Sequence, residues 1–327
     1  MRLSAEALHR EAGRTGFRPE MLEKVCFLLE LLDAIRRHPF LKSRVVLKGG
    51  TALNLFMFDM PRLSVDIDLN YIGALEREKM LAERPALERA LEAVAGRLNL
   101  ALQRAPEQAH AGGKWRLRYE SALGQGGTLE LDINYMYRVP LWPISKLDSP
   151  PVGSRQVLGI PVLDIHELAG GKLAALLSRG ASRDLFDTHY LLTNHNLEAG
   201  LLRTAFVLYG AMNRRDWRQV TVDDVRFDAR ELRNQLIPVL SGDTLARMSG
   251  TQVWSQKLVD ECKDALLMVL PFTDAENEFL DRLLGHGEIR ADVLGLDPRL
   301  TAIVQSHPAL LWKARNVRGN LTGSRPG

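Results

Sequence analysis

The stretch VVLKGGTALNLFMFDMPRLSVDIDLNY, residues 45–71, decides the fold. It opens with an apolar run that ends in two glycines, and a segment of helical character follows from Thr51. The last part alternates apolar and polar residues in the way that is typical of a strand, with Asp66 and Asp68 among its polar positions. The sequence therefore predicts a buried strand, a tight turn, a helix and a second strand that carries two carboxylates.

The carboxylates of this second strand belong to one face, because alternate side chains of a strand project to the same side. A hairpin predicted from KWRLRYES, GQGG and TLELDINYMYRV ends in a strand with the same pattern. The polar residues that share a face are Asp66, Asp68 and Asn70 in the first strand and Glu130, Asp132 and Asn134 in the second. If the two strands are neighbours, Asp132 can approach the Asp66 and Asp68 pair.

Three crowded carboxylates repel one another and raise one another's pKa. A divalent cation relieves that repulsion, and carboxylate oxygens are ligands that Mg²⁺ or Mn²⁺ accepts. The sequence therefore predicts a metal site formed by Asp66, Asp68 and Asp132. The alternative is a pair of amphipathic strands whose acidic faces are solvated.

The turn before these strands supplies a second feature. Gly49 and Gly50 permit close backbone approach, and the N-terminus of the following helix, at Thr51, offers free N–H groups and a positive dipole end that suit phosphate. Phosphates on the turn and a metal on the carboxylates are what phosphoryl or nucleotidyl transfer requires. Lys48, before the glycines, is either a solvated edge residue or a phosphate ligand.

Gly-Gly-Thr, then Ala-Leu-Asn-Leu and Pro-Arg-Leu-Ser-x-Asp-x-Asp-Leu resemble the first motif of the AbiEii/AbiGii toxin family. These are nucleotidyltransferase-fold proteins of the polymerase-β-like superfamily, and their relatives include the MenT toxins of mycobacteria. The resemblance continues in ELAGGKLAALLSRGASRDLFDTHYLL, residues 167–192, and in HPALLWK, residues 307–313. One departure is NLFMFDMPRLSV, which is about one residue longer than is usual before Asp66.

A second motif lies on two consecutive predicted helices. IHELAGGKLAALLS is followed by a stop at Arg-Gly and by a new helix in ASRDLFDTHYLL, for which Ser182 is the expected N-cap. Asp184 and Asp187 are three residues apart and share a face of the second helix. A short loop folds that helix back alongside Lys172 on the first.

The resemblance implies that Lys172 binds the nucleotide phosphates and that an aspartate of RDLFD is required for catalysis. The spacing from the lysine favours Asp187 over Asp184 for that role. The alternative is an ion-pair cluster of Lys172, Arg183, Asp184 and Asp187 that ties the two helices together. Arg183 is either a phosphate contact or a plain salt bridge, and Asp184 is the second candidate for the nucleotide site.

The chain as a whole divides into a mixed α/β part and a helical part. Helices are expected over residues 19–38 and 75–103, the second with a break at Pro85, and a last strand-like piece is RQVLGIPVLD. We predict an α/β (α+β) fold: a nucleotidyltransferase-like mixed sheet with flanking helices at residues 1–165, then a mainly helical domain at residues 166–327 that completes the cleft.

The composition excludes several classes of protein. The chain has 327 residues, of which 46% are hydrophobic and 25% charged, as in ordinary globular proteins. A net charge of +3 is far below that of a protein that coats nucleic acid. No apolar run is long enough to cross a bilayer and the N-terminus lacks a signal-peptide core, so we expect a cytoplasmic protein without membrane contact. Cys26 and Cys262 are expected to be reduced core residues.

Other candidates are weaker. His166, His189 and His195 lack the spacing of metal ligands. Trp217 adjoins three arginines, a combination that can hold single-stranded nucleic acid, but a loop with one anchoring aromatic is favoured. WKARNVR near the end is a basic candidate for RNA contact, or else it packs a terminal helix.

These patterns predict a metal-dependent enzyme that transfers a nucleoside monophosphate from an NTP to an acceptor hydroxyl. Asp66 and Asp68 would hold the metal, Asp132 would complete the site and help to deprotonate the acceptor, and Gly50 and Thr51 would cradle the phosphates. The resemblance implies the toxin of a toxin–antitoxin or abortive-infection pair, with the 3′ end of tRNA as acceptor and a separate antitoxin as partner. The rival hypotheses keep the fold: an enzyme that modifies a small molecule or a protein side chain, or a non-catalytic nucleotide- or RNA-binding protein.

Overall fold

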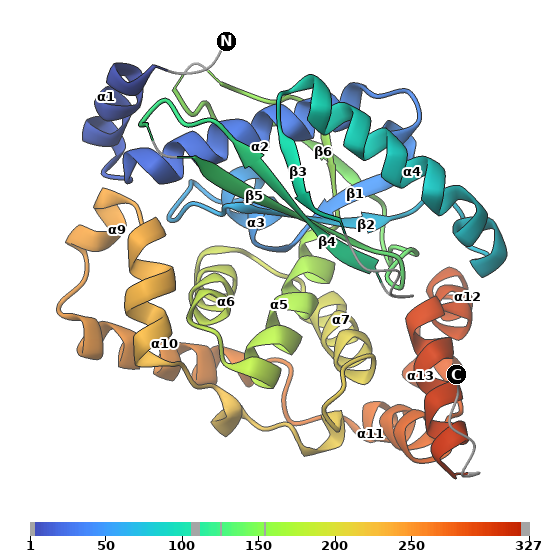
Figure 1. Cartoon of the computed structure of the whole chain (residues 1–327). Coiled ribbons are helices and arrows are strands. Elements are labelled where there is room, and N and C mark those ends of the chain that lie inside the picture. The colour runs from blue at the N-terminus through green and yellow to red at the C-terminus, as the bar shows by residue number, and fades with distance from the viewer. Residues whose placement is uncertain (1–3, 106–111, 125, 154, 322–327) are drawn as a thin grey trace. The chain divides into compact units, whose positions relative to one another are not determined.

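A computed structural model describes residues 4–105, 112–124, 126–153 and 155–321 (Figure 1). The backbone packs into two compact units, and neither is a single continuous segment of the chain. The first unit holds Met1–Arg138, Pro143–Leu163 and Arg233–Met248, and the second holds Val139–Trp142, Asp164–Leu232 and Ser249–Gly327. The chain therefore passes from one unit to the other several times.

The first unit is built on a seven-stranded mixed sheet with the strand order β3-β4-β5-β2-β1-β7-β6. Two neighbouring pairs, β2 with β5 and β1 with β7, are parallel, and the others are antiparallel. The strands are β1 (Val45–Lys48), β2 (Asp66–Tyr71), β3 (Ala101–Arg104), β4 (Gly112–Tyr119), β5 (Gly127–Asn134), β6 (Ser145–Leu147) and β7 (Ile160–Val162). The predicted mixed sheet and its β4–β5 hairpin are confirmed. β6 was not predicted, because its three residues lie in a proline-rich stretch.

Helices flank this sheet, and two long ones, α2 and α4, lie along it in Figure 1. The helices of the first unit are α1 (Ala5–Thr15), α2 (Pro19–Arg37), α3 (Gly49–Phe56), α4 (Arg77–Arg97) and α9 (Gly242–Ala246), with short 3₁₀ turns at Leu41–Ser43 and Ile237–Val239. The apolar stripe of α2, which includes Leu28 and Leu31, is fully buried. Burial of this stripe against the apolar face of the sheet provides the hydrophobic core of the unit.

Helix α4 differs from its prediction at two places. The break expected at Pro85 is wrong: the helix continues through it, since Pro85 lies on the exposed side, where the carbonyl that lost its donor can be hydrated. Met80 and Leu87 are buried on either side of the proline and hold the helix in place. The predicted end at residue 103 is also wrong, because Asn99 takes a left-handed φ of 57° and the chain then continues as β3.

The second unit is mainly helical, as predicted. Its helices are α5 (Ile165–Arg179), α6 (Ser182–Asn194), α7 (Ala199–Ala211), α8 (Ala229–Glu231), α10 (Thr251–Leu266), α11 (Asp274–Asp281), α12 (Pro298–Ser306) and α13 (Pro308–Leu321). Shorter turns occur at Trp217–Gln219, Val222–Asp224, Arg282–His286 and Ala291–Leu294, and the turn at Leu232–Leu236 leads back into the first unit. Trp217 is fully buried beside Gly210 and Phe206, so it anchors its loop and cannot stack on a nucleic-acid base.

The predicted N-cap of α6 is one residue too late. Ala181 occupies the cap, and Ser182 is the first helical residue. Ser182 is fully buried, its hydroxyl donates to the carbonyl of Asp228, and its backbone N–H donates to the carboxylate of Glu231. The serine therefore joins α6 to a distant turn and does not close its own helix.

The two cysteines are buried, as predicted, and burial raises the pKa of both the Cys26 and the Cys262 thiol to about 12. Across the described ranges no helix combines the length and the apolar character that a bilayer span requires.

Candidate active site

Asp68 and Asp132 face each other on neighbouring strands. β2 and β5 run parallel, and their register pairs Asp66 with Glu130, Asp68 with Asp132 and Asn70 with Asn134. Adjacent strands lie about 4.8 Å apart, so the polar side chains of the two strands form one shared surface. The predicted approach of Asp132 to the Asp66 and Asp68 pair is confirmed.

Apolar side chains on the opposite faces of β2 and β5 fix the register of these two strands. Ile67 and Leu69 of β2 and Leu131 and Ile133 of β5 are buried with at most 2% of their surface exposed. A slip of one residue would turn the apolar side chains outward and the carboxylates into the core. Hydrophobic burial therefore holds the carboxylates on the polar face.

The facing carboxylates belong to a row of four charges that crosses the sheet. Lys48 of β1 is register-paired with Asp68, and Lys114 of β4 is register-paired with Asp132. We call these four residues, Lys48, Asp68, Asp132 and Lys114, the charged row. Lys48 is half-buried on an interior strand, so the alternative of a solvated edge residue is wrong.

The charged row sets the acidity of Asp132. Burial raises the pKa of this carboxyl above its ordinary value, the charge of Lys48 acts against that rise, and the charge of Asp68 adds to it. Lys114 contributes a smaller opposing effect, while its ammonium also lies 3.2 Å from Glu130. Asp132 is therefore a stronger base than an ordinary surface aspartate.

A third lysine lies near Asp66. The Nζ of Lys24, on α2, is 4.0 Å from Oδ1 of Asp66. The sequence reasoning missed Lys24 and Lys114. The alternation of KWRLRY opposite the acidic strand of the hairpin was a usable signal for Lys114, whereas Lys24 comes near Asp66 only through the packing of α2.

The diglycine turn comes next to the charged row. Gly49 has a left-handed φ of 73°, and a Cβ built on it would overlap the carboxylate of Asp68. Helix α3 begins at Gly49, earlier than the predicted Thr51, and its N-cap residue Lys48 makes no side-chain capping bond. The first N–H groups of α3 therefore lack a side-chain cap beside Asp68, as the predicted phosphate site requires.

Thr51 has a structural task as well. Its side chain is fully buried, and its hydroxyl contacts the backbone carbonyl of Asp66 and lies 3.0 Å from Oγ of Ser64. These contacts join α3 to the start of β2 and so position Asp66. A phosphate contact at Thr51 would come from its backbone N–H.

The row of polar residues ends in two asparagines with different surroundings. Oδ1 of Asn134 accepts hydrogen bonds from the backbone N–H groups of Met136 and Tyr137, at 2.8 and 3.0 Å. Asn70 is fully buried, and neither of its side-chain polar atoms has a hydrogen-bond partner among the described residues. Because an unpaired buried amide is costly, Asn70 marks a place where a bound polar group would be stabilised.

The carboxylates of this site meet one requirement of a divalent metal such as Mg²⁺, which is the supply of oxygen ligands. Within the described ranges no group of three or more His, Cys, Asp or Glu side chains is arranged to hold an ion, so the three aspartates do not form a ready cage. The facing carboxylates of Asp68 and Asp132 do supply hard oxygen donors. Mg²⁺ in phosphoryl-transfer sites takes one or two carboxylates and completes its shell with water and substrate phosphates, which two facing aspartates can accommodate.

The second motif forms a buried charged cluster in the helical unit. Lys172 of α5 lies 3.0 Å from Asp184 and 2.7 Å from Asp187, both on α6, and Arg179 lies 2.6 Å from Asp184. The two aspartates have at most 1% of their surface exposed. The prediction that both share a face toward Lys172 is confirmed, and the cluster ties α5 to α6.

Opposing effects act on the acidity of this cluster. Burial disfavours the charged form of Asp184, but the charges of Lys172 and Arg179, with their hydrogen bonds, outweigh it and hold the pKa of Asp184 below its ordinary value. Arg183, the neighbour of Asp184, is half-buried on the same helix.

Histidines near this motif have structural partners. His189 lies 2.5 Å from Glu261, and the ring of His166 contacts Asp164 and the backbone N–H of Glu198.

Glu167 is a buried acid that the sequence did not reveal. Its side chain accepts hydrogen bonds from the Tyr209 hydroxyl at 2.9 Å and from the Leu141 N–H at 3.0 Å. Burial raises the pKa of Glu167 to about 7, despite these bonds. At the first turn of a helix a glutamate is expected to be exposed, so no local signal predicted its burial.

Comparisons with known proteins bear on this site. A sequence model of the family described as nucleotidyl transferase AbiEii toxin, of a type IV toxin–antitoxin system, matches residues 30–260, a range that includes both the charged row and the Lys172 cluster. No curated protein sequence matches the chain. Among solved structures the chain is similar to MenT4, a nucleotidyltransferase toxin from Mycobacterium tuberculosis H37Rv, with a TM-score of 0.57 and 17% identity over 94% of this chain and 99% of that one. At this identity the likeness shows a shared fold.

Proposed function

The chain belongs to the AbiEii family of nucleotidyltransferase toxins, and from this premise we propose that it transfers a nucleoside monophosphate from an NTP to the 3′ end of tRNA. The observation that carries the proposal is the facing pair Asp68 and Asp132 beside the diglycine turn. This pairing offers a place for metal and phosphates within one small region of the first unit.

The triphosphate would bind at the diglycine turn. The left-handed Gly49 keeps the approach open, and the backbone N–H groups of Gly50 and Thr51 at the start of α3 would contact phosphate oxygens. Lys48 stands directly beside this turn and supplies a positive charge. Backbone donors, helix dipole and lysine together favour the anionic part of the nucleotide.

Asp68 and Asp132 would hold a divalent cation, Mg²⁺ or Mn²⁺, with Asp66 as a further oxygen donor. When bound, such an ion neutralises phosphate charge and stabilises the displaced pyrophosphate. Lys24 and Lys114, close to Asp66 and Asp132, would partly balance the carboxylates when no nucleotide is bound. This arrangement limits the mutual repulsion of the carboxylates.

Asp132 would also accept the proton of the acceptor hydroxyl. Burial raises its pKa as long as no cation is bound, and the efficiency of a general base increases with its basicity. Deprotonation makes the hydroxyl oxygen a stronger nucleophile toward the α-phosphorus of the NTP. Pyrophosphate then leaves from the opposite side.

Lys172 and Asp187, of the helical unit, would take part in nucleotide binding. A half-buried lysine held by two buried aspartates would act as a point charge for phosphate, and Asp187 would orient it while Arg183 and Asp184 support nucleotide binding. A phosphate role for Lys172 predicts that Lys172→Met raises the KM for NTP by tenfold or more even at a temperature where the variant stays folded.

The tRNA acceptor is supported by charge at the end of the chain. Residues 298–327 contain five Lys or Arg and no Asp or Glu, although the whole chain has a net charge of only +3. Helix α13 exposes half of Trp312, next to the exposed Arg315. An aromatic ring beside cations suits a nucleic-acid strand. Such substrates place the reaction in the cytoplasm, and a separate antitoxin protein would restrain it.

The experiment that tests this function offers the purified protein each α-labelled NTP with Mg²⁺ and three competing acceptors: total tRNA, total protein and an aminoglycoside. We expect the label in tRNA. We expect no label in tRNA whose 3′-terminal nucleotide was oxidised before the reaction. Asp132→Asn should abolish the transfer, and Asp243→Asn, at an exposed position, should leave it unchanged. Label in protein or drug alone would contradict the tRNA proposal, and equal growth arrest by wild type and Asp66→Ala would point to a non-catalytic binding protein.

A further inference from the structure

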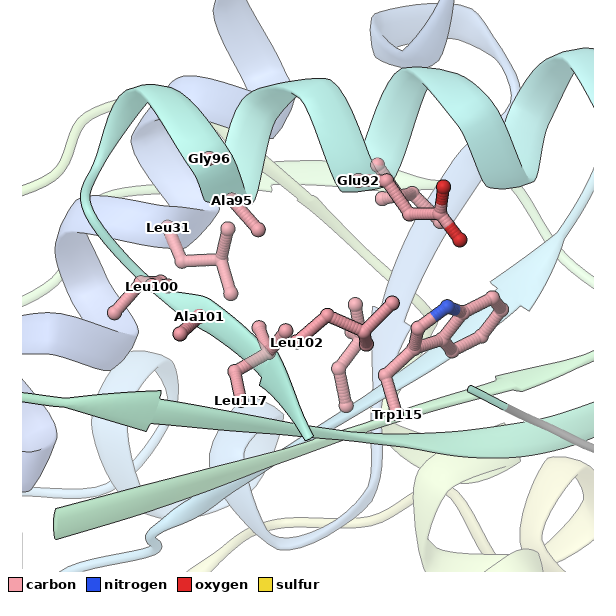
Figure 2. Close-up of a pocket in the computed structure, with 11 residues that line it drawn as sticks. Leu31, Glu92, Ala95, Gly96, Leu100, Ala101, Leu102, Trp115 and Leu117 are labelled. Carbon is pink, nitrogen blue, oxygen red and sulfur yellow. The ribbon is translucent and has the colours of Figure 1, made fainter. Parts of the chain in front are cut away.

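A cavity lies on the apolar side of the same sheet. Its volume is about 280 Å³, it is open to solvent on one side, and residues of α2, α4 and strands β3, β4 and β5 line it (Figure 2). Its walls are mostly aliphatic or aromatic and include Leu31, Leu91, Ala95, Trp115, Leu117 and Leu131. An apolar cavity of roughly 150 Å³ already suffices for a benzene-sized guest, so this one has room for a larger molecule.

One polar group of the cavity wall has no partner. Trp115 has 2% of its surface exposed, and its Nε1 makes no hydrogen bond with any described residue. Figure 2 shows this nitrogen on the ring edge that faces α4, the helix from which Glu92 extends. A buried N–H without an acceptor is costly, so a guest that supplies an acceptor would be stabilised.

The rim of the cavity limits the charge of the guest. Glu92 is exposed and lines the cavity mouth. Its carboxylate would repel an anion, and the apolar walls disfavour a charged guest of either sign because they offer it no partner.

We propose that this cavity binds a small, uncharged, mainly apolar molecule that carries one hydrogen-bond acceptor, and that the acceptor takes the N–H of Trp115. The phenyl ketones represent this class. The walls bury the apolar body of the guest and Trp115 fixes its orientation, which is the usual division of labour in a small-molecule site.

The cavity is a second site and is distinct from the charged row. Leu131 lines the cavity, while its neighbours Glu130 and Asp132 project to the opposite face of β5. Trp115 likewise alternates with Lys114, a member of the charged row. A guest would therefore contact the reverse side of the two strands that carry Asp132 and Lys114.

The test uses calorimetric titration of the full chain, without NTP, with acetophenone and ethylbenzene. The two probes share a phenyl ring, and only the ketone has an acceptor. We expect saturable binding at one site, with acetophenone tighter by up to about tenfold, as one hydrogen bond allows. Because no transfer is measured, failure here is distinct from failure of the proposed function.

Variants assign the binding to the cavity. Trp115→Phe should retain ethylbenzene and lose the preference for acetophenone. Ala95→Leu fills the cavity and should abolish both affinities, whereas Ala93→Leu, the same change at an exposed position of α4, should preserve them. Melting temperatures confirm that each variant is folded.

Any one of three results would overturn the proposal. One is the absence of saturable binding of either probe to the wild type. Another is an equal preference for acetophenone in the wild type and in Trp115→Phe. A crystal grown with acetophenone in which Glu92 or a water takes the Trp115 N–H and the cavity holds no probe would also overturn it.

Discussion

A side chain at position 49 cannot coexist with the carboxylate of Asp68 in its observed place, because the Cβ of any residue there would overlap that carboxylate. Gly49 also has a φ of 73°, which L-residues rarely adopt. We therefore expect Gly49→Ala to displace Asp68 and to lower nucleotidyl transfer by at least about a hundredfold, on the scale of losing one positioned charged group.

The matched control for Gly49→Ala is Gly13→Ala in α1, where an added Cβ meets nothing within 4 Å. That change should leave transfer unaltered and stabilise the fold by about 0.5 kcal/mol. Transfer rates with labelled NTP and urea unfolding of both variants provide the measurement. Full activity of Gly49→Ala would show that transfer does not require Asp68 in its observed position.

The acid limb of the pH–rate profile should report Asp132. Burial raises the pKa of Asp132 and Lys48 lowers it, so removing the lysine charge must raise it further. We expect Lys48→Met to shift the acid limb of kcat to higher pH, since Asp132 must lose its proton to act as a base. Lys42→Met, at an exposed position, should keep the wild-type limb. If the acid limb of the kcat profile does not shift in Lys48→Met, another group acts as the base.

The Lys172 cluster should dominate the stability of the helical unit. Lys172→Met leaves Asp184 and Asp187 buried without their lysine, and breaking a buried pair in this way costs about 3 kcal/mol or more. Lys257→Met removes an exposed pair with Glu261 and should cost less than about 1 kcal/mol. Chemical unfolding curves compare the two. Similar small losses would show that the cluster is not a structural tie.

Glu167 should make the protein less stable as the pH rises from acid to neutral. Since its pKa is raised from 4.5 to about 7 in the fold, the folded state holds this proton more tightly than the unfolded chain does. The stabilisation is complete below about pH 4.5 and is lost as the pH approaches 7, a difference of up to about 3 kcal/mol.

The variant Glu167→Gln should lack that pH dependence, because the amide does not titrate. Glu198→Gln, at an exposed position, should behave as the wild type. Free energies of unfolding, measured from pH 4.5 to pH 7 for the wild type and both variants, test this prediction. Parallel curves for wild type and Glu167→Gln would show that Glu167 stays ionised throughout this range.

Much of the site followed from local patterns. The alternation of polar and apolar residues predicted that Asp66 and Asp68 share a face with Asp132 of another strand. Helical spacing predicted that Asp184 and Asp187 lie on the side of their helix that faces Lys172. These features depend on period and sequence order alone. The mixed sheet followed for the same reason.

The features that sequence did not reveal depend on contacts between distant segments. Lys24 meets Asp66 only because α2 packs on the sheet, and Glu167 is buried by Tyr209 and Leu141. The continuation of α4 through Pro85 likewise depends on buried neighbours that outweigh local propensity.

The return of residues 233–248 to the first unit has a consequence during protein synthesis. In this segment Val239 accepts a hydrogen bond from the N–H of Leu63, and Leu240 bridges to Arg62, just ahead of the strand that carries Asp68. A ribosome must therefore extend the chain well past the sheet before the nascent polypeptide can finish folding around the carboxylates of β2 and β5. Synthesis of these two strands and completion of the fold around them are thereby separated in time.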